Sequence, residues 1–213
     1  MRTIRTSIKH CLFFLIPYGI FLVCAGLALV LFSKEQIHLS INRHYSSFAD
    51  FIMPYITWAG DGYALTILII LLVAWKRRYG LWVGISTAAA SGITQLLKNT
   101  VFLGEPRPKL FFANLHPLRF VPGVENYLYD SFPSGHTTGA FAFYFSLVFL
   151  VKNNYLKLAL FLFALLVGYS RIYLSQHFLG DVFAGSIVGT TTSFILMTMA
   201  IHKNWLKTPH LQL

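Results

Sequence analysis

The chain has 213 residues with a mean hydropathy of +0.62, and 56% of them are hydrophobic while only 11% are charged. Soluble domains carry about 25% charged residues, so this composition excludes an ordinary soluble protein and indicates a chain that lies largely in lipid. The net charge of +10 does not indicate a nucleic-acid partner, because the basic residues form small clusters between apolar runs.

Apolar runs predict six membrane-spanning helices, each close to the roughly 20 residues that a span needs. Residues 11–32 carry no charge over 22 positions, which is too long for a signal-peptide core, and are expected to form a retained first span. The segment 34–54 is weakly amphipathic and fits either an interfacial helix or a loop. The later expected spans run from Tyr55 to Trp75, Tyr79 to Leu97, Ser134 to Val151, Tyr155 to Leu174 and Val182 to Ile201.

The sequence therefore predicts one all-α domain over residues 1–213, an integral membrane bundle of six transmembrane helices. A long outer loop, residues 98–133, separates helices three and four. A loop of this length is typically functional or disordered. No repeat or linker indicates a second domain.

Six spans place both termini on one side of the membrane, and the charges sort accordingly. Ten of the 17 Lys and Arg residues fall on that side, while the other seven share the opposite side with all seven Asp and Glu residues. Because basic residues concentrate in cytoplasmic loops, we expect cytoplasmic termini and outer loops at 98–133 and 171–181. The ten basic residues are Arg2, Arg5, Lys9, Lys76, Arg77, Arg78, Lys152, Lys157, Lys203 and Lys207.

Three polar clusters lie on the expected outer side, where ionisable groups near the membrane are functional candidates. They are Lys98 with Arg107, the tetrapeptide PSGH at 133–136, and SRIYLSQHFLGD at 170–181. In the last cluster, His177 and Asp181 share one face if the backbone is helical, so that the carboxylate orients the imidazole and frees its other nitrogen as a nucleophile or base. The alternative is an aspartate that starts a helix beside an interfacial histidine.

The other two clusters offer groups that bind anions. Ser134 and Gly135 precede an apolar run as a helix start would, and the exposed N–H groups there suit an anion. The alternative is a simple helix cap followed by an interfacial His136. Arg107 offers a planar fork that matches phosphate oxygens, and Lys98 offers a point charge. The alternative is a pair of interfacial anchors, with Lys98 extending to the membrane surface.

Taken together, the clusters hold two histidines, an orienting carboxylate, three cations and a helix N-terminus. Phosphoryl transfer through a phosphohistidine requires such a set. The outer loops contain no compact carboxylate or histidine-rich group of the kind that metal-assisted hydrolysis uses. We therefore expect metal-independent chemistry without a cofactor.

These motifs resemble the type-2 phosphatidic acid phosphatase superfamily, whose pattern is a Lys and Arg-Pro block, then PSGH, then SR followed by His and Asp. The last two blocks match without a gap, and the resemblance spans residues 98–181 by motif. It implies a membrane lipid phosphate phosphatase in which His177 is the nucleophile, Asp181 its partner and His136 the general acid. It also implies a phosphate-binding set, which comprises Lys98, Arg107, Ser134, Gly135 and Arg171.

One spacing departs from that family pattern. Lys98 and Arg107 enclose eight residues, NTVFLGEP, where the family usually has six. The extra residues fit a turn at 104–106, because Gly and Pro suit turns.

The hypothesis is thus an integral membrane enzyme that hydrolyses a lipid phosphate or diphosphate at the outer face through a phosphohistidine. We expect a bacterial cytoplasmic membrane, with the site periplasmic or extracellular. Undecaprenyl diphosphate, phosphatidate, phosphatidylglycerol phosphate and lipid A phosphate all remain open as substrates. Two rivals are a small transporter or flippase with an anion site, and a phosphate-lipid binder without turnover.

Aromatic and small residues leave further alternatives. The loop aromatics are either lipid contacts or ordinary interfacial anchors. Glycine pairs at 135/139 and 185/189 permit close helix approach, which either packs the bundle or joins two copies, so the oligomeric state stays open. The aromatics are Phe102, Phe111, Phe112, Phe120, Tyr127 and Tyr129.

Overall fold

The computed structural model describes residues 2–206, and within that range it contains helices and no strand, which confirms the all-α class. Lys207, counted above with the cytoplasmic charges, lies outside the described residues. The helices are α1 (Arg2–Leu31), α2 (Lys34–Arg43), α3 (Ser47–Trp58), α4 (Gly62–Trp75), α5 (Arg77–Thr100), α6 (Pro108–Phe111), α7 (Gly135–Val148), α8 (Asn154–Tyr173) and α9 (Leu179–His202).

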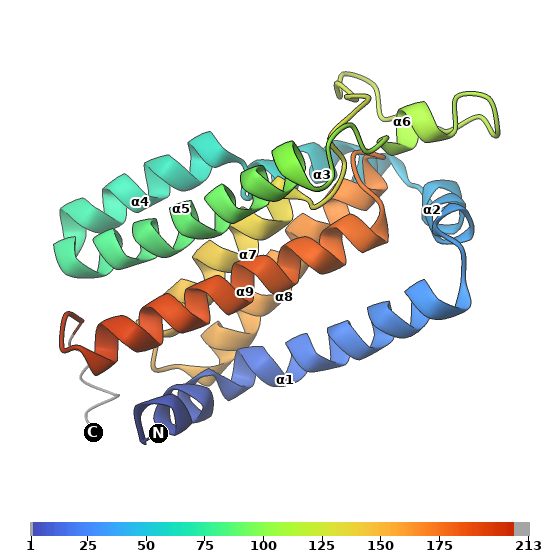
Figure 1. The fold of residues 1–213 in the computed structure, drawn as a ribbon. Coiled ribbons are helices and arrows are strands. Elements are labelled where there is room, and N and C mark those ends of the chain that lie inside the picture. The colour runs from blue at the N-terminus through green and yellow to red at the C-terminus, as the bar shows by residue number, and fades with distance from the viewer. Residues whose placement is uncertain (1, 207–213) are drawn as a thin grey trace.

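The long helices lie side by side as one bundle with α7 at its centre (Figure 1). The first helix begins and the last one ends at the same end of this bundle, while α2, α3, α6 and the loop before α7 gather at the opposite end. Most residues of α7 are buried among α5, α8 and α9. A helix that is apolar or small-sided all round is typical of such a buried position or of a membrane span.

Two glycines of α9 allow this helix to touch the backbone of α7. A Cβ atom built at Gly189 would lie 2.5 Å from the carbonyl oxygen of Thr138, and one at Gly185 would lie 2.7 Å from that of Ser134. Close approach of this kind is the role of small residues between helices in lipid. The glycine spacing of α9 therefore packs the bundle itself, and it brings the first turn of α9 beside the first turn of α7.

Three helical segments are long and apolar enough to cross a membrane, namely residues 3–31, α8 and α9. The pair α3 and α4 also qualifies, but the two helices meet at an angle of 55°. The segment Tyr55 to Trp75 that we expected to span the membrane is therefore not one continuous helix, and its first residues belong to α3. The hydropathy of residues 55–75 does not reveal the break at residues 59–61. At this break, Asp61 caps α4 by accepting a hydrogen bond from the N–H of Tyr63.

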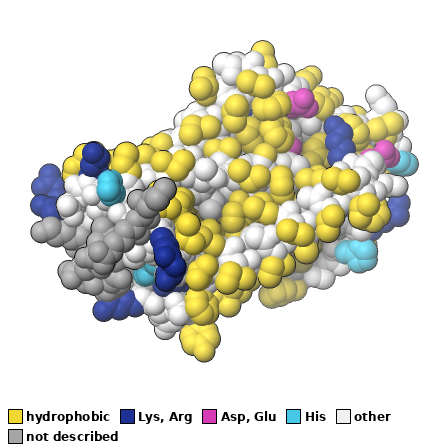
Figure 2. Space-filling model, turned by 60° about the horizontal axis from the view of Figure 1, so that its bottom comes forward, with side chains coloured by type: hydrophobic (Ala, Val, Ile, Leu, Met, Phe, Trp, Pro, Cys, Tyr) yellow, Lys and Arg dark blue, Asp and Glu magenta, His cyan; other side chains and the backbone are white. Residues whose placement is uncertain are grey.

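The surface of the bundle fits lipid over its middle. Figure 2 shows hydrophobic side chains across the centre of one face, with Lys and Arg at both ends and Asp and Glu at one end only. Along α1, large apolar side chains such as Ile20 and Val23 are more than half exposed. Exposed apolar area of this extent is unfavourable in water. The chain is thus an integral membrane protein.

The segment after α1 is helical and not a plain loop. Ser33 and Gln36 form a capping box that starts α2. One side of α2 packs inward, since His38 is buried and stacks on Phe112 with ring centroids 5.5 Å apart. This helix and α3 both contact the long loop at Arg119, whose carbonyl accepts from Asn42 of α2 and whose guanidinium donates to Asp50 of α3.

Candidate active site

His177 lies between α8 and α9, and Asp181 lies in the first turn of α9. The imidazole Nδ1 is 3.2 Å from Asp181 Oδ2. The helical backbone expected from 177 to 181 is not present, because α9 begins at Leu179 and its N-cap residue Phe178 is extended, so the two side chains meet at the start of α9 and not along a helix face. The same carboxylate oxygen accepts hydrogen bonds from Ser131 Oγ at 2.5 Å and from the N–H of Phe178 at 2.9 Å. Asp181 is thus both the helix-start aspartate and the partner of the histidine, and three donors fix its position.

The other nitrogen of His177 faces a guanidinium. Arg107 Nη1 lies 3.4 Å from His177 Nε2. Because a guanidinium can only donate, Nε2 must be the accepting, unprotonated nitrogen, and the ring proton must sit on Nδ1 toward Asp181. Burial, followed by the positive charges of Arg107, Arg171 and Lys98, holds the pKa of His177 well below its usual range. A neutral imidazole whose Nε2 carries no proton is a nucleophile.

Gln176 joins the two arginines of the site. Its Oε1 accepts hydrogen bonds from Arg107 Nη1 and Arg171 Nη2, each at 3.4 Å. Its Nε2 donates to the carbonyl of Glu125 at 2.6 Å and to Asn126 Oδ1 at 2.7 Å. One side chain therefore ties both guanidinium groups to the long loop.

Arg171 is buried and has unused donor capacity. Its Nη1 donates to Thr57 Oγ1 at 2.7 Å, so α3 and α8 hold it from two sides. Its Nε has no hydrogen-bond partner among the described residues. A buried charged donor without a partner is costly, which makes this N–H available to an anion.

The unusual spacing after Lys98 forms a turn, as predicted. Gly104 has φ +74°, and its N–H donates to Asp130 Oδ1 at 3.4 Å. Lys98 Nζ donates to the carbonyl of Asp130 at 2.5 Å, and Arg107 Nε donates to that of Tyr129 at 2.7 Å. Both cations are thus held on one short stretch of backbone, and Lys98 is buried instead of reaching toward the surface.

The first turn of α7 carries the PSGH motif. Ser134 is the N-cap residue, and its hydroxyl oxygen accepts from Thr137 Oγ1 at 2.9 Å. Its own N–H donates to the carbonyl of Asp181 at 3.0 Å, which joins this turn to α9. Gly135 is exposed, with no atom near the place of a Cβ. The first N–H groups of a helix lack intrahelical partners, so this turn offers donors to an anion.

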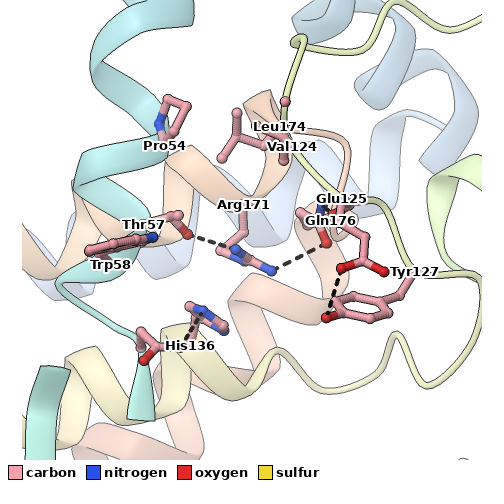
Figure 3. A pocket seen from close by; sticks show the side chains of 12 residues that line it. Pro54, Thr57, Trp58, Val124, Glu125, Tyr127, His136, Arg171, Leu174 and Gln176 are labelled. Carbon is pink, nitrogen blue, oxygen red and sulfur yellow. Dashed lines mark hydrogen bonds and ion pairs between the residues drawn. The ribbon is translucent and has the colours of Figure 1, made fainter. Parts of the chain in front are cut away.

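A pocket of about 290 Å³ opens beside these groups. His136 and Arg171 point into it from different helices, and Gln176 closes one side (Figure 3). His136 Nε2 lies 3.5 Å from Asp61 Oδ2. The lining residues are Pro54, Thr57, Trp58, Asp61, Gly123, Val124, Glu125, Tyr127, His136, Arg171, Leu174 and Gln176.

The structure therefore brings the predicted residues together from α5, the long loop, α7, α8 and α9. Burial lowers the pKa of Arg107 from its usual range, as it does for His177. Within residues 2–206, no three His, Cys, Asp or Glu side chains lie close enough to hold a metal ion.

Sequence reasoning missed several residues of the site. Gln176 lies inside the matched motif, but at a position where the motif specifies no residue type. Asp61 and Ser131 belong to no motif. The interfacial interpretation is wrong for Phe112, which is 2% exposed and packs beneath the site against His38. Tyr127, in contrast, is exposed and lines the pocket.

Comparison with known proteins adds a family to this geometry. Residues 79–205 match the PAP2 superfamily. The chain is 36% identical to undecaprenyl-diphosphatase BcrC of Bacillus subtilis over 156 residues, which cover 71% of this chain and 75% of that protein.

Two crystal structures have a similar fold. The structure of Aquifex aeolicus LpxE matches with a TM-score of 0.67 and 28% identity, over 76% of this chain and 93% of that one. The structure of a transmembrane PAP2 type phosphatidylglycerolphosphate phosphatase from Bacillus subtilis matches with a TM-score of 0.67 and 25% identity. The second match covers 93% of this chain and 96% of the Bacillus subtilis chain, so the similarity extends over nearly the whole bundle.

Proposed function

Because the chain belongs to the PAP2 superfamily and is a membrane phosphatase acting on phosphoric esters, we propose that it removes a terminal phosphate from a lipid phosphate or diphosphate at the outer face of the membrane. The observation that carries this proposal is the state of His177. Its Nδ1 is bonded to Asp181, and its unprotonated Nε2 faces the guanidinium of Arg107. A nucleophile beside a phosphate-binding cation is what phosphoryl transfer to a histidine needs.

The reaction proceeds in two steps. His177 Nε2 attacks phosphorus, the bond from phosphorus to the leaving oxygen breaks, and His136 gives a proton to that oxygen. Water then attacks the phosphohistidine, His136 takes a proton from this water, and inorganic phosphate leaves His177 free. Asp181 keeps the Nδ1 proton of His177 in place and stabilises the charge on the ring during both steps.

The remaining predicted residues stabilise charge on the phosphoryl oxygens. Arg107, Arg171 and Lys98 supply positive charge, and the turn at Ser134 and Gly135 supplies N–H groups. Since these groups belong to the chain itself, the reaction needs no metal ion or cofactor, and we expect EDTA to leave turnover unchanged.

The pocket supports a lipid as the substrate. The apolar side chains of Pro54 and Leu174 line one part of it, Arg171 and His136 line another (Figure 3), and Trp58 adds an apolar ring from α3. Trp58 is 70% exposed on α3, so the apolar part continues to the surface of the bundle. An amphiphile with a phosphate head and an apolar tail matches this division. Undecaprenyl diphosphate, phosphatidate, phosphatidylglycerol phosphate and lipid A phosphate are all amphiphiles of this kind.

The topology that we propose has six spans, formed by α1, the pair α3 and α4, α5, α7, α8 and α9. The termini then lie in the cytoplasm and the long loop lies outside, in the periplasm if the membrane is the bacterial cytoplasmic one. The charge distribution supports this orientation. In a background without the native cysteines, Asn114→Cys should react with an impermeant thiol reagent in whole cells and Lys152→Cys should not. The reverse pattern would invert the topology.

Phosphate release by the purified protein in detergent, with EDTA present, tests the function. Each of the four lipids is offered to the wild type, to His177→Ala and to His116→Ala. His116 is the control because it is an exposed histidine of the long loop. We expect release from at least one lipid, a loss of about 10⁴-fold or more in His177→Ala, and normal release in His116→Ala. Wild-type turnover in His177→Ala would contradict the proposal, and lipid translocation without phosphate release would favour the transporter.

A further inference from the structure

Asp61 lies at the break between α3 and α4, outside every motif that the sequence offers. Its Oδ2 is 3.5 Å from His136 Nε2, and both side chains line the pocket. About one third of each side chain is exposed, 34% for Asp61 and 30% for His136. Both groups of the pair are therefore accessible from the pocket.

The break is anchored on α7 next to His136. A Cβ atom at Gly60 would lie 2.8 Å from the carbonyl oxygen of His136, so only glycine fits between the two backbones. The hydroxyl of Tyr144 donates to the carbonyl of Ala59 at 3.0 Å, one residue earlier. These two backbone contacts hold Asp61 close to His136, so the distance between the pair does not depend on side-chain conformation alone.

The two carboxylate oxygens of Asp61 have separate partners. Oδ1 accepts from the N–H of Tyr63 at 2.8 Å and caps α4, and Oδ2 faces His136. The cap locks the side-chain orientation, since turning Oδ2 away from the imidazole would break it. A capping residue alone would not require the close approach at Gly60.

His136 needs such a partner because its surroundings are positive. A general acid must carry a proton before the leaving oxygen departs, yet nearby cations disfavour an imidazolium. A carboxylate at ion-pair distance acts in the opposite direction. The charged and titratable groups around His136 are Asp61 at the α3–α4 break, Lys98 of α5, Arg107, Glu125 and Tyr127 of the long loop, Arg171 of α8 and His177 after α8.

We propose that Asp61 is a positioning residue that holds a proton on His136 for the departing oxygen. This inference rests on the proposed function. The Nε2–H of the imidazolium donates to Asp61, and the other ring nitrogen gives its proton to the leaving oxygen as the bond to phosphorus breaks. In the second step that nitrogen takes a proton from the attacking water, which restores the imidazolium beside Asp61.

Asp61→Asn tests the inference, because asparagine is nearly the same size and still caps a helix while it lacks the charge. With phosphatidate, whose leaving alkoxide needs a proton, kcat should fall about 10- to 100-fold, within the range of general acid catalysis. The basic limb of the pH profile should move to lower pH, since the imidazolium has lost its partner. With p-nitrophenyl phosphate, whose leaving group needs no proton, the initial phosphoryl transfer measured in a single turnover should fall less than about threefold.

Glu35→Gln is the matched control. Glu35 forms the same kind of pair with a histidine, His116, at 3.0 Å in an exposed place away from the pocket. This control should behave as the wild type with both substrates. If Asp61→Asn does not fold, Asp61→Ser retains the helix cap and removes the charge in another way.

The outcomes separate the inference from the function. Unchanged kcat with phosphatidate in Asp61→Asn, or an equal loss with both esters, would overturn the role of Asp61 while the phosphatase activity stands. A wild type that releases phosphate from no ester would overturn the proposed function, and the role of Asp61 with it. A selective loss with phosphatidate and an unaffected control would support the inference.

Discussion

The two histidines of the site have opposite surroundings. His177 is 1% exposed, and its carboxylate partner is buried and held by two further donors. His136 opens into the pocket, and its carboxylate partner is partly exposed at a helix break. The same side chain can therefore serve as a protected, unprotonated nucleophile in one place and as a proton carrier in contact with substrate and water in another. Environment and not residue type assigns these roles.

Removing the charge of the buried carboxylate should have the largest effect on this pair of roles. In Asp181→Asn, an amide faces Nδ1 and no longer selects the tautomer that frees Nε2. We expect kcat to fall about 10³- to 10⁴-fold, measured as phosphate release from the preferred lipid. The loss should exceed that of Asp61→Asn by at least tenfold, since Asp61 assists only proton transfer. Equal losses in the two variants would contradict the division between the histidines.

Burial of histidines, as at His177 and also at His38 of α2, predicts an effect of pH on the stability of the fold. Burial lowers the pKa of His38 to about 4, so this histidine takes up its proton first in the unfolded chain. Its contribution to stability is complete above the unfolded pKa of about 6.5 and falls as the pH drops toward 4. From pH 7.5 to pH 5 the loss is about 2 kcal/mol, and the buried His177 adds to it in the same direction.

Chemical unfolding in mild detergent at the two pH values measures this loss. His38→Asn cannot take up the proton, so its stability should depend on pH less steeply, by about 2 kcal/mol over the same range. The exposed His116→Asn variant should retain the full wild-type dependence. An identical pH dependence in His38→Asn and in the wild type would show that His38 is not held neutral by burial.

The smallest expected effect concerns the residue between the two arginines. In Gln176→Leu, Arg107 and Arg171 lose their shared acceptor, and the long loop loses two hydrogen bonds. We expect KM for the lipid and the inhibition constant of vanadate to rise about tenfold, with kcat changed less, because phosphate binding and not proton transfer is affected. Gln95→Leu, an exposed glutamine of α5, is the control. Tighter vanadate binding in Gln176→Leu would mean that Gln176 competes with phosphate and does not position the arginines.

The parts of the site that sequence predicts best are those built from neighbours in the chain. The pair His177 and Asp181 lies only four residues apart, although His177 precedes α9 and the contact does not need the helical backbone that we expected, and the cap at Ser134 follows from the residues before an apolar run. The apolar runs likewise locate α1, α8 and α9 to within a few residues at their C-terminal ends.

Local sequence patterns do not predict the contacts between segments that are distant in the chain. Asp61 and His136 are 75 positions apart in the chain. Their contact depends on a helix break inside an apolar run, which hydropathy does not reveal. Ser131 reaches Asp181 across 50 positions, with no motif at the serine. Gln176 lies within a recognised pattern, but its bonds to both arginines and to the loop depend on how the loop folds back. Tertiary packing decides these contacts, and local propensity carries little information about them.

Trapping the phosphorylated enzyme tests the central claim most directly. His136→Ala is mixed with p-nitrophenyl phosphate, quenched rapidly under alkaline conditions, digested and examined by mass spectrometry. This ester needs no acid for its first step, while the second step still needs a base, so the intermediate should accumulate. We predict a phosphoryl group on the peptide that contains His177 and none in the doubly substituted His136→Ala, His177→Ala protein. Release of nitrophenol without phosphorylation of His177, or a phosphoryl group on another residue, would contradict it.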